Sequence, residues 1–213
     1  YNFKDVRAEL EKKGHRFKSE TDTEVVLYAY KEWGDDFLSH LRGMFGLALW
    51  DIGKKRLILA RDRIGIKPLH YSIVGDVLLF ASEQKSLLQF DKVNRAVHRQ
   101  AVFNFLNINY TPGNDTFFAG IKRVPAGYML IYDQAIGVKG IRFKKYWDIP
   151  VNIQNISDAD AINQLNSHMT RTIREHLMSD VPFGAYLSGG VDSSAIVGYM
   201  SQLVDEPIKT YSV

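Results

Sequence analysis

The segment Leu187–Ser194 contains the residues whose types and spacing are best suited to chemistry, because it joins two adjacent glycines to serines and an aspartate. Glycine has no Cβ atom, so Gly189 and Gly190 allow positive φ angles and a close approach of the backbone to a ligand. Successive N–H groups can then surround phosphate oxygens, and the serine hydroxyls of the segment add further donors. The segment therefore predicts a loop that binds a polyphosphate.

The flanking sequence places this loop between a strand and a helix. An apolar run, Phe183–Leu187, precedes it, and a run with helical spacing, Ala195–Leu203, follows it. A helix N-terminus attracts anions through its unpaired N–H groups and its dipole. The spacing excludes a Walker-type loop, because no lysine follows the glycines, and a dinucleotide fingerprint, because the third glycine is absent. The alternative is an ordinary glycine turn in which Asp192 or Ser193 caps the helix.

The composition is that of an ordinary globular protein. Of 213 residues, 46% are apolar and 24% are charged, which is enough for one or two domains. The net charge is only +3 and no apolar run approaches a membrane span, so we expect no nucleic-acid or membrane partner and a cytoplasmic location. The chain contains no cysteine, which excludes disulfides, thiolate metal sites and a cysteine nucleophile within it.

Helical periodicity comes first along the chain and extended runs follow. Phe3–Lys13 has apolar residues at helical spacing and is followed by Gly14, and Thr21–Glu24 has the pattern of a capping box ahead of a helix that Gly34 ends. Alternating apolar runs then predict antiparallel hairpins, and two further segments predict short helices. The expected strands are residues 44–50, 57–61, 69–74, 77–81, 128–132 and 138–146, and the short helices are residues 83–90 and 99–107.

In the last third of the chain, the pattern changes from hairpins to alternating helices and strands. The stretch Ile149–Asn155 has no clear period and contains a proline, so we place a domain boundary there. Ser157–Asp160 caps a long amphipathic helix that we expect Pro182 to end. A strand, a helix and a second strand, Ile208–Val213, then alternate as in a parallel sheet.

Several motifs, in the right order, resemble the glutaminase domain of glutamine-hydrolysing asparagine synthetases. They are Thr21–Val25, Arg42–Phe45, Ala60–Leu69, Phe80–Glu83, Tyr110–Gly113 and Val124–Gly127. The loop Leu187–Ser194 resembles the pyrophosphate loop of ATP pyrophosphatases, with which the synthetase domain of that family begins. The resemblance covers essentially the whole chain, although related amidotransferases share much of it.

The resemblance implies a two-site enzyme. Residues 1–150 would form an incomplete N-terminal-nucleophile glutaminase, an α+β fold of two antiparallel sheets between helices, in which a cysteine releases ammonia from glutamine. Residues 151–213 would begin an α/β parallel-sheet ATP pyrophosphatase domain, which uses ATP and Mg²⁺ to adenylate aspartate before ammonia displaces AMP. The implied small-molecule partners are glutamine, aspartate and ATP, and members of the family are often homodimers.

The resemblance also assigns roles to single residues. Asp22 matches the aspartate that binds the α-amino group of glutamine, although an acid in a first helical turn also stabilises the helix. Asp192 has the carboxylate oxygens that Mg²⁺ prefers, and we assign it to the metal. The positions matching the ATP site are Leu187, Ser188, Gly189, Gly190, Asp192, Ser193, Ser194 and Val213. Leu187 and Val213 also suit the core of a parallel sheet.

Two other expectations concern a charged cluster and the catalytic nucleophile. We interpret Arg61–Arg63 as a structural ion-pair network and not as a catalytic set. Because cleaving the glutamine amide requires an activated nucleophile, we assign no catalytic residue here, expect this chain alone not to hydrolyse glutamine, and expect the family's remaining segments to lie outside it. Three interpretations stay open: part of an asparagine synthetase, a related amidotransferase acting on a sugar or peptide acid, and a non-catalytic nucleotide-binding protein.

Overall fold

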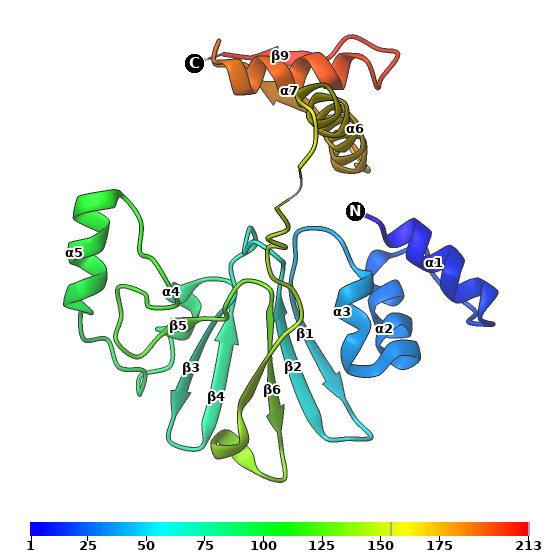
Figure 1. Cartoon of the computed structure of the whole chain (residues 1–213). Helices are drawn as coiled ribbons and strands as arrows, with labels where there is room; N and C mark the ends of the chain where they lie inside the picture. The colour runs from blue at the N-terminus through cyan, green and yellow to red at the C-terminus, as the bar shows by residue number, and fades with distance from the viewer. Residues whose placement is uncertain (154, 213) are drawn as a thin grey trace. The chain divides into compact units, whose positions relative to one another are not determined.

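The computed structural model describes residues 1–153 and 155–212 of the chain (Figure 1). The chain divides into two compact units: the first is Val6–Ile149, and the second combines Pro150–Val213 with Tyr1–Asp5. The first unit contains antiparallel sheets, and the second contains a parallel pair of strands. Across the described part of the chain, every helix is too short or too polar to span a bilayer.

Two antiparallel sheets form the centre of the first unit. One has the strand order β1-β2-β6-β7 and the other β4-β3-β5. The strands are β1 (Gly46–Asp51), β2 (Arg56–Arg61), β3 (His70–Val74), β4 (Val77–Ala81), β5 (Lys122–Arg123), β6 (Tyr128–Asp133) and β7 (Arg142–Lys145). Local turn chemistry closes the hairpins: Asp51 accepts the N–H of Lys54 at 2.9 Å between β1 and β2, and Gly75 has a φ of 59° between β3 and β4.

The two sheets pack through side chains that alternate along their strands. Leu59 of β2 and Leu130 of β6 are fully buried, and Tyr71 of β3 and Leu78 of β4 pack against the cluster that they form. Because successive side chains of a strand point to opposite faces, the neighbours of these leucines lie on the other face of the first sheet, where they are buried as well. Those neighbours are Ile58, Ala60, Met129 and Ile131.

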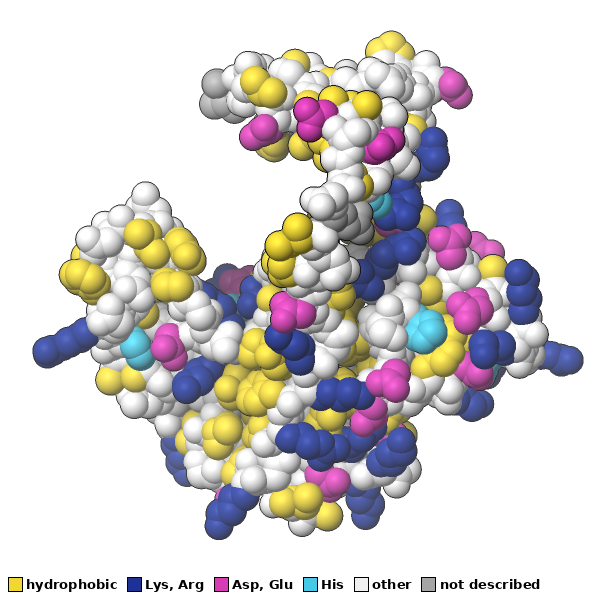
Figure 2. Space-filling view, viewed as in Figure 1, with side chains coloured by type: hydrophobic (Ala, Val, Ile, Leu, Met, Phe, Trp, Pro, Cys, Tyr) yellow, Lys and Arg dark blue, Asp and Glu magenta, His cyan; other side chains and the backbone are white. Residues whose placement is uncertain are grey.

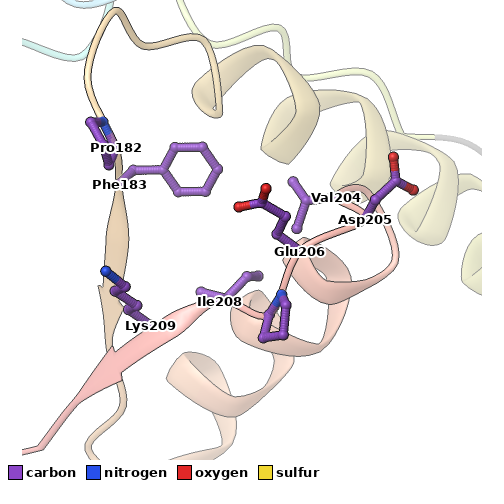
Figure 3. A pocket seen from close by; sticks show the side chains of 8 residues that line it. Pro182, Phe183, Val204, Asp205, Glu206, Ile208 and Lys209 are labelled. Atoms are coloured by element: carbon purple, nitrogen blue, oxygen red, sulfur yellow. The ribbon is translucent and has the colours of Figure 1, made fainter.

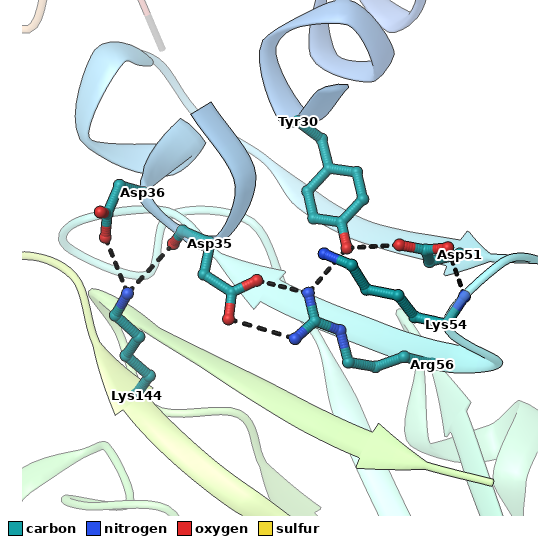
Figure 4. A network of polar contacts seen from close by, with 7 residues as sticks. All are labelled: Tyr30, Asp35, Asp36, Asp51, Lys54, Arg56 and Lys144. Atoms are coloured by element: carbon teal, nitrogen blue, oxygen red, sulfur yellow. Dashed lines mark hydrogen bonds and ion pairs between the residues drawn. The ribbon is translucent and has the colours of Figure 1, made fainter. Parts of the chain in front are cut away.

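The N-terminal helices come next, and a polar network attaches the second of them to this first sheet. They are α1 (Phe3–Lys12), α2 (Asp22–Trp33) and α3 (Phe37–His40). Arg56 of β2 donates to Asp35 at 3.1 Å and to the hydroxyl of Tyr30 at 2.7 Å, and Tyr30 donates to Asp51 at 2.7 Å (Figure 4). Lys144 of β7 donates to the backbone oxygen of Asp35 at 3.4 Å. The end of α2 and the turn that follows it are thereby attached to three strands.

The second sheet carries its own small core and two further helices, α4 (Gln84–Leu87) and α5 (Arg99–Ile108). Leu87 of α4 and Ile121 are buried together beside Leu79 of β4. By contrast, α5 leaves Phe103 and Leu106 exposed, and Figure 2 shows hydrophobic side chains gathered at this helix. Two antiparallel sheets packed face to face and flanked by helices are the architecture that the sequence predicts, so the predicted α+β fold is confirmed.

The second unit consists of α6 (Asp158–His176), β8 (Gly184–Tyr186), α7 (Val191–Ser201) and β9 (Lys209–Tyr211). Ser157 caps α6 by accepting the N–H of Asp160 at 3.1 Å, as its sequence predicts. The strands β8 and β9 pair in parallel, with Ala185 opposite Thr210. The predicted strand, helix and strand of a parallel sheet are therefore present.

Two predictions about elements are wrong, and one short strand was not predicted. Residues 137–140 form a 3₁₀ helix and the strand begins only at Arg142, so the expected strand over residues 138–146 is much shorter. The helix α6 ends at His176, six residues ahead of Pro182, and in the segment between them Ser179 accepts the N–H of Val181 and donates to its carbonyl. The two-residue strand β5 has no counterpart among the predicted elements.

The side chains of Arg61 and Asp62 bind backbone groups of the loop that follows β2. Asp62 is fully buried and accepts the N–H groups of Ile66 at 2.9 Å and Lys67 at 2.8 Å. Arg61 donates to the carbonyl oxygens of Lys67 at 2.9 Å and Gly65 at 2.6 Å. The expected ion-pair network is therefore wrong for these two residues, whose partners are peptide groups, although their role is structural.

We expect Asp62→Ala to lower the free energy of unfolding by about 3 kcal/mol or more, because buried N–H groups left without an acceptor cost roughly 1–3 kcal/mol each. The measurement is urea denaturation of the 213-residue chain, followed by circular dichroism. Asp76→Ala, in the exposed β3–β4 turn, is the control and should change stability by less than about 0.5 kcal/mol. Equal effects of the two substitutions would contradict the role given to Asp62.

Candidate functional site

Asp22, the predicted glutamine ligand, is the first residue of α2. Its carboxylate is exposed, and among the described residues it accepts a hydrogen bond from the hydroxyl of Thr23 alone, at 3.4 Å. Thr21 is the N-cap and accepts the N–H of Glu24 at 3.4 Å. An exposed carboxylate at this position can stabilise the helix dipole and still bind a cationic group, so both predicted roles of Asp22 are compatible with its geometry.

The expected capping box at this helix is only half formed. The second half would have the Glu24 carboxylate accept the N–H of Thr21, the N-cap residue. Instead the carboxylate accepts the N–H groups of Lys18 at 2.9 Å and Ser19 at 2.7 Å, and the hydroxyl of Ser19 at 2.6 Å. Several hydrogen bonds hold the pKa of Glu24 below its usual value, and the one from the Ser19 hydroxyl has the largest effect. The backbone bends at Lys18 and Ser19, which presents these earlier N–H groups to Glu24.

The loop Leu187–Ser194 has the geometry of an open anion site. Gly189 has a φ of 80°, and no heavy atom of the described residues, its two chain neighbours aside, lies within 4 Å of the position that a Cβ would occupy there. Gly190 is the N-cap of α7 and makes no side-chain capping bond, so the alternative in which Asp192 or Ser193 caps the helix is wrong. The N–H of Ser194 donates to the carbonyl of Gly190 at 3.1 Å. The N–H groups of the preceding helical residues have no such intrahelical acceptor and can donate to a ligand.

Side chains of the same loop contact one another. The hydroxyls of Ser188 and Ser193 lie 3.1 Å apart, and Ser193 also donates to the carbonyl of Gly190 at 3.1 Å. Leu187 is tied to the neighbouring strand, because its N–H donates to the carbonyl of Tyr211 at 2.8 Å. The structure thus brings together the predicted ATP-site residues from Leu187 to Ser194, whereas Val213 lies outside the described residues.

Asp192 presents an exposed carboxylate in the first turn of α7, two residues after the N-cap. Among residues 1–153 and 155–212, no group of three or more His, Cys, Asp or Glu side chains could hold a metal ion. A lone carboxylate still suits Mg²⁺, which is commonly held by one or two carboxylates together with water and substrate phosphates. The exposed carboxylate of Asp192 therefore fits a magnesium ion that arrives with a nucleotide.

A cavity of about 650 Å³ lies elsewhere in the second unit (Figure 3). Its lining comes from the segment before β8, from the start of β9 and from the connection between α7 and β9. These residues are Pro182, Phe183, Val204, Asp205, Glu206, Pro207, Ile208 and Lys209. The cavity lies at the amino ends of the two parallel strands, whereas the glycine loop follows the carboxyl end of β8. It is therefore separate from the predicted nucleotide loop, and no sequence pattern indicated it.

Comparison with known proteins identifies both parts of the chain. Residues 1–147 match the family profile described as "Glutamine amidotransferase domain", and residues 164–213 match the profile described as "Asparagine synthase". A relative from Bacillus subtilis (strain 168), "Asparagine synthetase [glutamine-hydrolyzing] 3", is 35% identical over 100% of this chain and 35% of its own length. "Amidase chry2" from Gibberella zeae is 33% identical over 98% of this chain and 31% of its own length.

Among solved structures, the glutamine phosphoribosylpyrophosphate amidotransferase of B. subtilis, complexed with ADP and GMP, is similar at 19% identity. The similarity covers 98% of this chain and 43% of that one, with a TM-score of 0.46. The chain spans about a third of the length of the curated relatives that it matches. The profile match over residues 1–147 shows that the chain belongs to the glutamine amidotransferase family, and the residues that follow are similar to asparagine synthases.

Proposed function

We propose that the protein, at the length of its relatives, is a glutamine-dependent ligase that converts aspartate to asparagine. Glutamine hydrolysis would supply ammonia, and ATP would activate the β-carboxylate of aspartate as an adenylate, with AMP and pyrophosphate as products. The observation that carries the proposal is the succession of two matches in one chain: a glutamine amidotransferase domain over residues 1–147 and an asparagine synthase over residues 164–213.

On the glutamine side, we assign to Asp22 the binding of the substrate's α-ammonium group. Its exposed carboxylate, with a single hydroxyl donor at 3.4 Å, supports this role because it is free to accept charge-assisted hydrogen bonds. Hydrolysis of the glutamine amide needs an activated nucleophile as well. The 213 residues contain no cysteine, so we assign them the binding of glutamine and not the covalent step.

On the ATP side, the loop Leu187–Ser194 would bind the phosphates. A carboxylate is a poor electrophile, and forming its adenylate creates a good leaving group while pyrophosphate departs. Backbone N–H groups at the start of α7 and the hydroxyls of Ser188, Ser193 and Ser194 would balance the charge that builds up on that pyrophosphate. When bound, Mg²⁺ supplies further charge neutralisation, and we assign Asp192 to hold it, directly or through water.

A related amidotransferase acting on another carboxylic acid is the second candidate. Two relatives named as amidases, "Amidase chry2" of G. zeae and "Amidase chyE" of Penicillium rubens, are 33% and 34% identical to this chain and support it. ATP–pyrophosphate exchange by the full-length protein, measured with aspartate and with a panel of sugar and peptide acids, separates the candidates. Exchange that depends on another acid favours the second, and no exchange with any acid leaves a non-catalytic nucleotide-binding protein.

We expect Asp192→Ala in the full-length protein to reduce aspartate-dependent ATP–pyrophosphate exchange by about 100-fold, because it removes a ligand of the ion that neutralises the phosphates. Glutamine hydrolysis, measured as glutamate release, should stay within about twofold of the wild type. Asp180→Ala, an exposed acid just ahead of β8, is the matched control and should leave both activities unchanged. Equal loss of the two activities would contradict separate sites.

We expect Asp22→Ala to raise the KM for glutamine roughly 10- to 100-fold, since hydrogen bonds to charged groups contribute about 1.5–3 kcal/mol. Synthesis from added ammonium should be spared, because free ammonia bypasses glutamine binding. The measurement is steady-state asparagine formation with each nitrogen donor, with Glu9→Ala on the exposed side of α1 as the control. Unchanged glutamine kinetics would remove Asp22 from the site.

A further inference from the structure

Ser19, three residues ahead of Asp22, has each of its polar groups engaged. Its N–H and its hydroxyl donate to the Glu24 carboxylate at 2.7 Å and 2.6 Å, and its carbonyl accepts from the guanidinium of Arg7 at 2.9 Å. The N–H of Lys18 donates to the same carboxylate at 2.9 Å. A surface segment is thus fixed between an acid of α2 and a base of α1.

Neighbouring contacts fasten the same segment further. Arg7 is itself held by Glu11 at 2.9 Å and lies over the ring of Phe17, 4.8 Å from its centroid. The ring of Phe17 packs edge-on against Tyr28 of α2, and Tyr28 donates to the carbonyl of Arg16 at 2.8 Å. These contacts come from both helices, so the segment Arg16–Ser19 has little freedom to move relative to α2.

The Ser19 hydroxyl transmits this constraint to the start of α2. It lies 3.0 Å from the hydroxyl of Thr21 and accepts the N–H of Thr21 at 3.4 Å. Thr21 is the N-cap of the helix whose first residue is Asp22. Glu24 is therefore bound through Ser19 to the residue that precedes Asp22, while the Asp22 carboxylate itself remains exposed.

The two acids of this turn consequently differ in what they can do. The Glu24 carboxylate already accepts three hydrogen bonds from the chain, whereas Asp22 accepts one weak bond from Thr23. A ligand-binding group works best when its surroundings hold it in the productive geometry before the ligand arrives. Glu24 is placed to provide that support, and Asp22 is placed to bind.

We propose that Glu24 is a positioning residue for glutamine use: by holding Ser19, it fixes the turn that presents the Asp22 carboxylate to the α-ammonium group of glutamine. This inference rests on the proposed function. Its consequence is that an acid which contacts only the protein chain controls the apparent affinity for one of the two nitrogen donors, and leaves the use of free ammonia unchanged.

The test compares Glu24→Ala with Glu32→Ala in the full-length protein. Glu32 is a matched control because it lies on the same helix and also bonds outside it, to Lys13 at 3.1 Å and His15 at 2.9 Å. We expect Glu24→Ala to raise the KM for glutamine about 10-fold, with ammonium-dependent synthesis unchanged. Glu32→Ala should leave the glutamine KM unchanged, even where it lowers the melting temperature.

Two further variants cover a failure of Glu24→Ala to fold. Glu24→Gln keeps one acceptor oxygen and should raise the glutamine KM less than the alanine variant does, and Ser19→Ala should raise it without altering any charge. The inference is overturned if the wild type uses glutamine while all folded variants at positions 19 and 24 keep its KM, or if the control at position 32 raises the KM equally. A wild type that uses no glutamine overturns the proposed function and this inference together.

Discussion

Burial of β2 and β6 on both of their faces is the constraint on which the first unit depends. Leu59 and Leu130 pack toward the second sheet, while Ile58 and Ile131, one residue along each strand, are buried on the opposite face. Because side chains alternate strictly along a strand, a shift of one residue in the β2–β6 pairing would exchange the two sets. The register that pairs Leu59 with Leu130 and Ile58 with Ile131 is therefore specified twice.

Backbone N–H and C=O groups outside the strands need other hydrogen-bond partners, and charged side chains provide them in two places. Where β2 ends, the chain turns into a loop whose N–H groups are satisfied by the buried Asp62 and whose carbonyls are satisfied by Arg61. The carboxylate of Glu24, in the first turn of α2, accepts the N–H groups of Lys18 and Ser19, which precede the helix. In both places a carboxylate accepts hydrogen bonds from backbone N–H groups. The same kind of residue in the first turn of α2, Asp22, remains available for a ligand.

In the second unit, by contrast, backbone N–H groups at the start of a helix are left without an intrahelical acceptor. Its glycine loop has open space above Gly189, and the first N–H groups of α7 have no intrahelical acceptor. N–H groups without an intrahelical acceptor can donate to an anionic ligand, which is why the proposed function places the phosphates of ATP at this loop. The cavity near Phe183 and Ile208 lies at the other end of the parallel strands.

The sequence by itself determined the features that depend on neighbours along the chain. Hairpins such as β3–β4 around Gly75, the Ser157 cap of α6 and the strand, loop and helix around Gly189 follow from periodicity and from the φ angles that glycine allows. The ordered motifs were also sufficient to indicate the family that the profile matches show. Local chemistry decided all of these.

Only the tertiary structure decided which partner each polar side chain takes. The sequence pattern predicted that the Glu24 carboxylate accepts the N–H of Thr21, but a bend at Lys18 and Ser19 presents their N–H groups to it instead. Ion pairs were predicted around Asp62, yet the loop after β2 folds back and the N–H groups of Ile66 and Lys67 donate to its carboxylate instead. A buried or half-buried charge binds whichever donor or acceptor the fold brings within about 3 Å, and folding sets that distance between residues that composition and spacing do not relate.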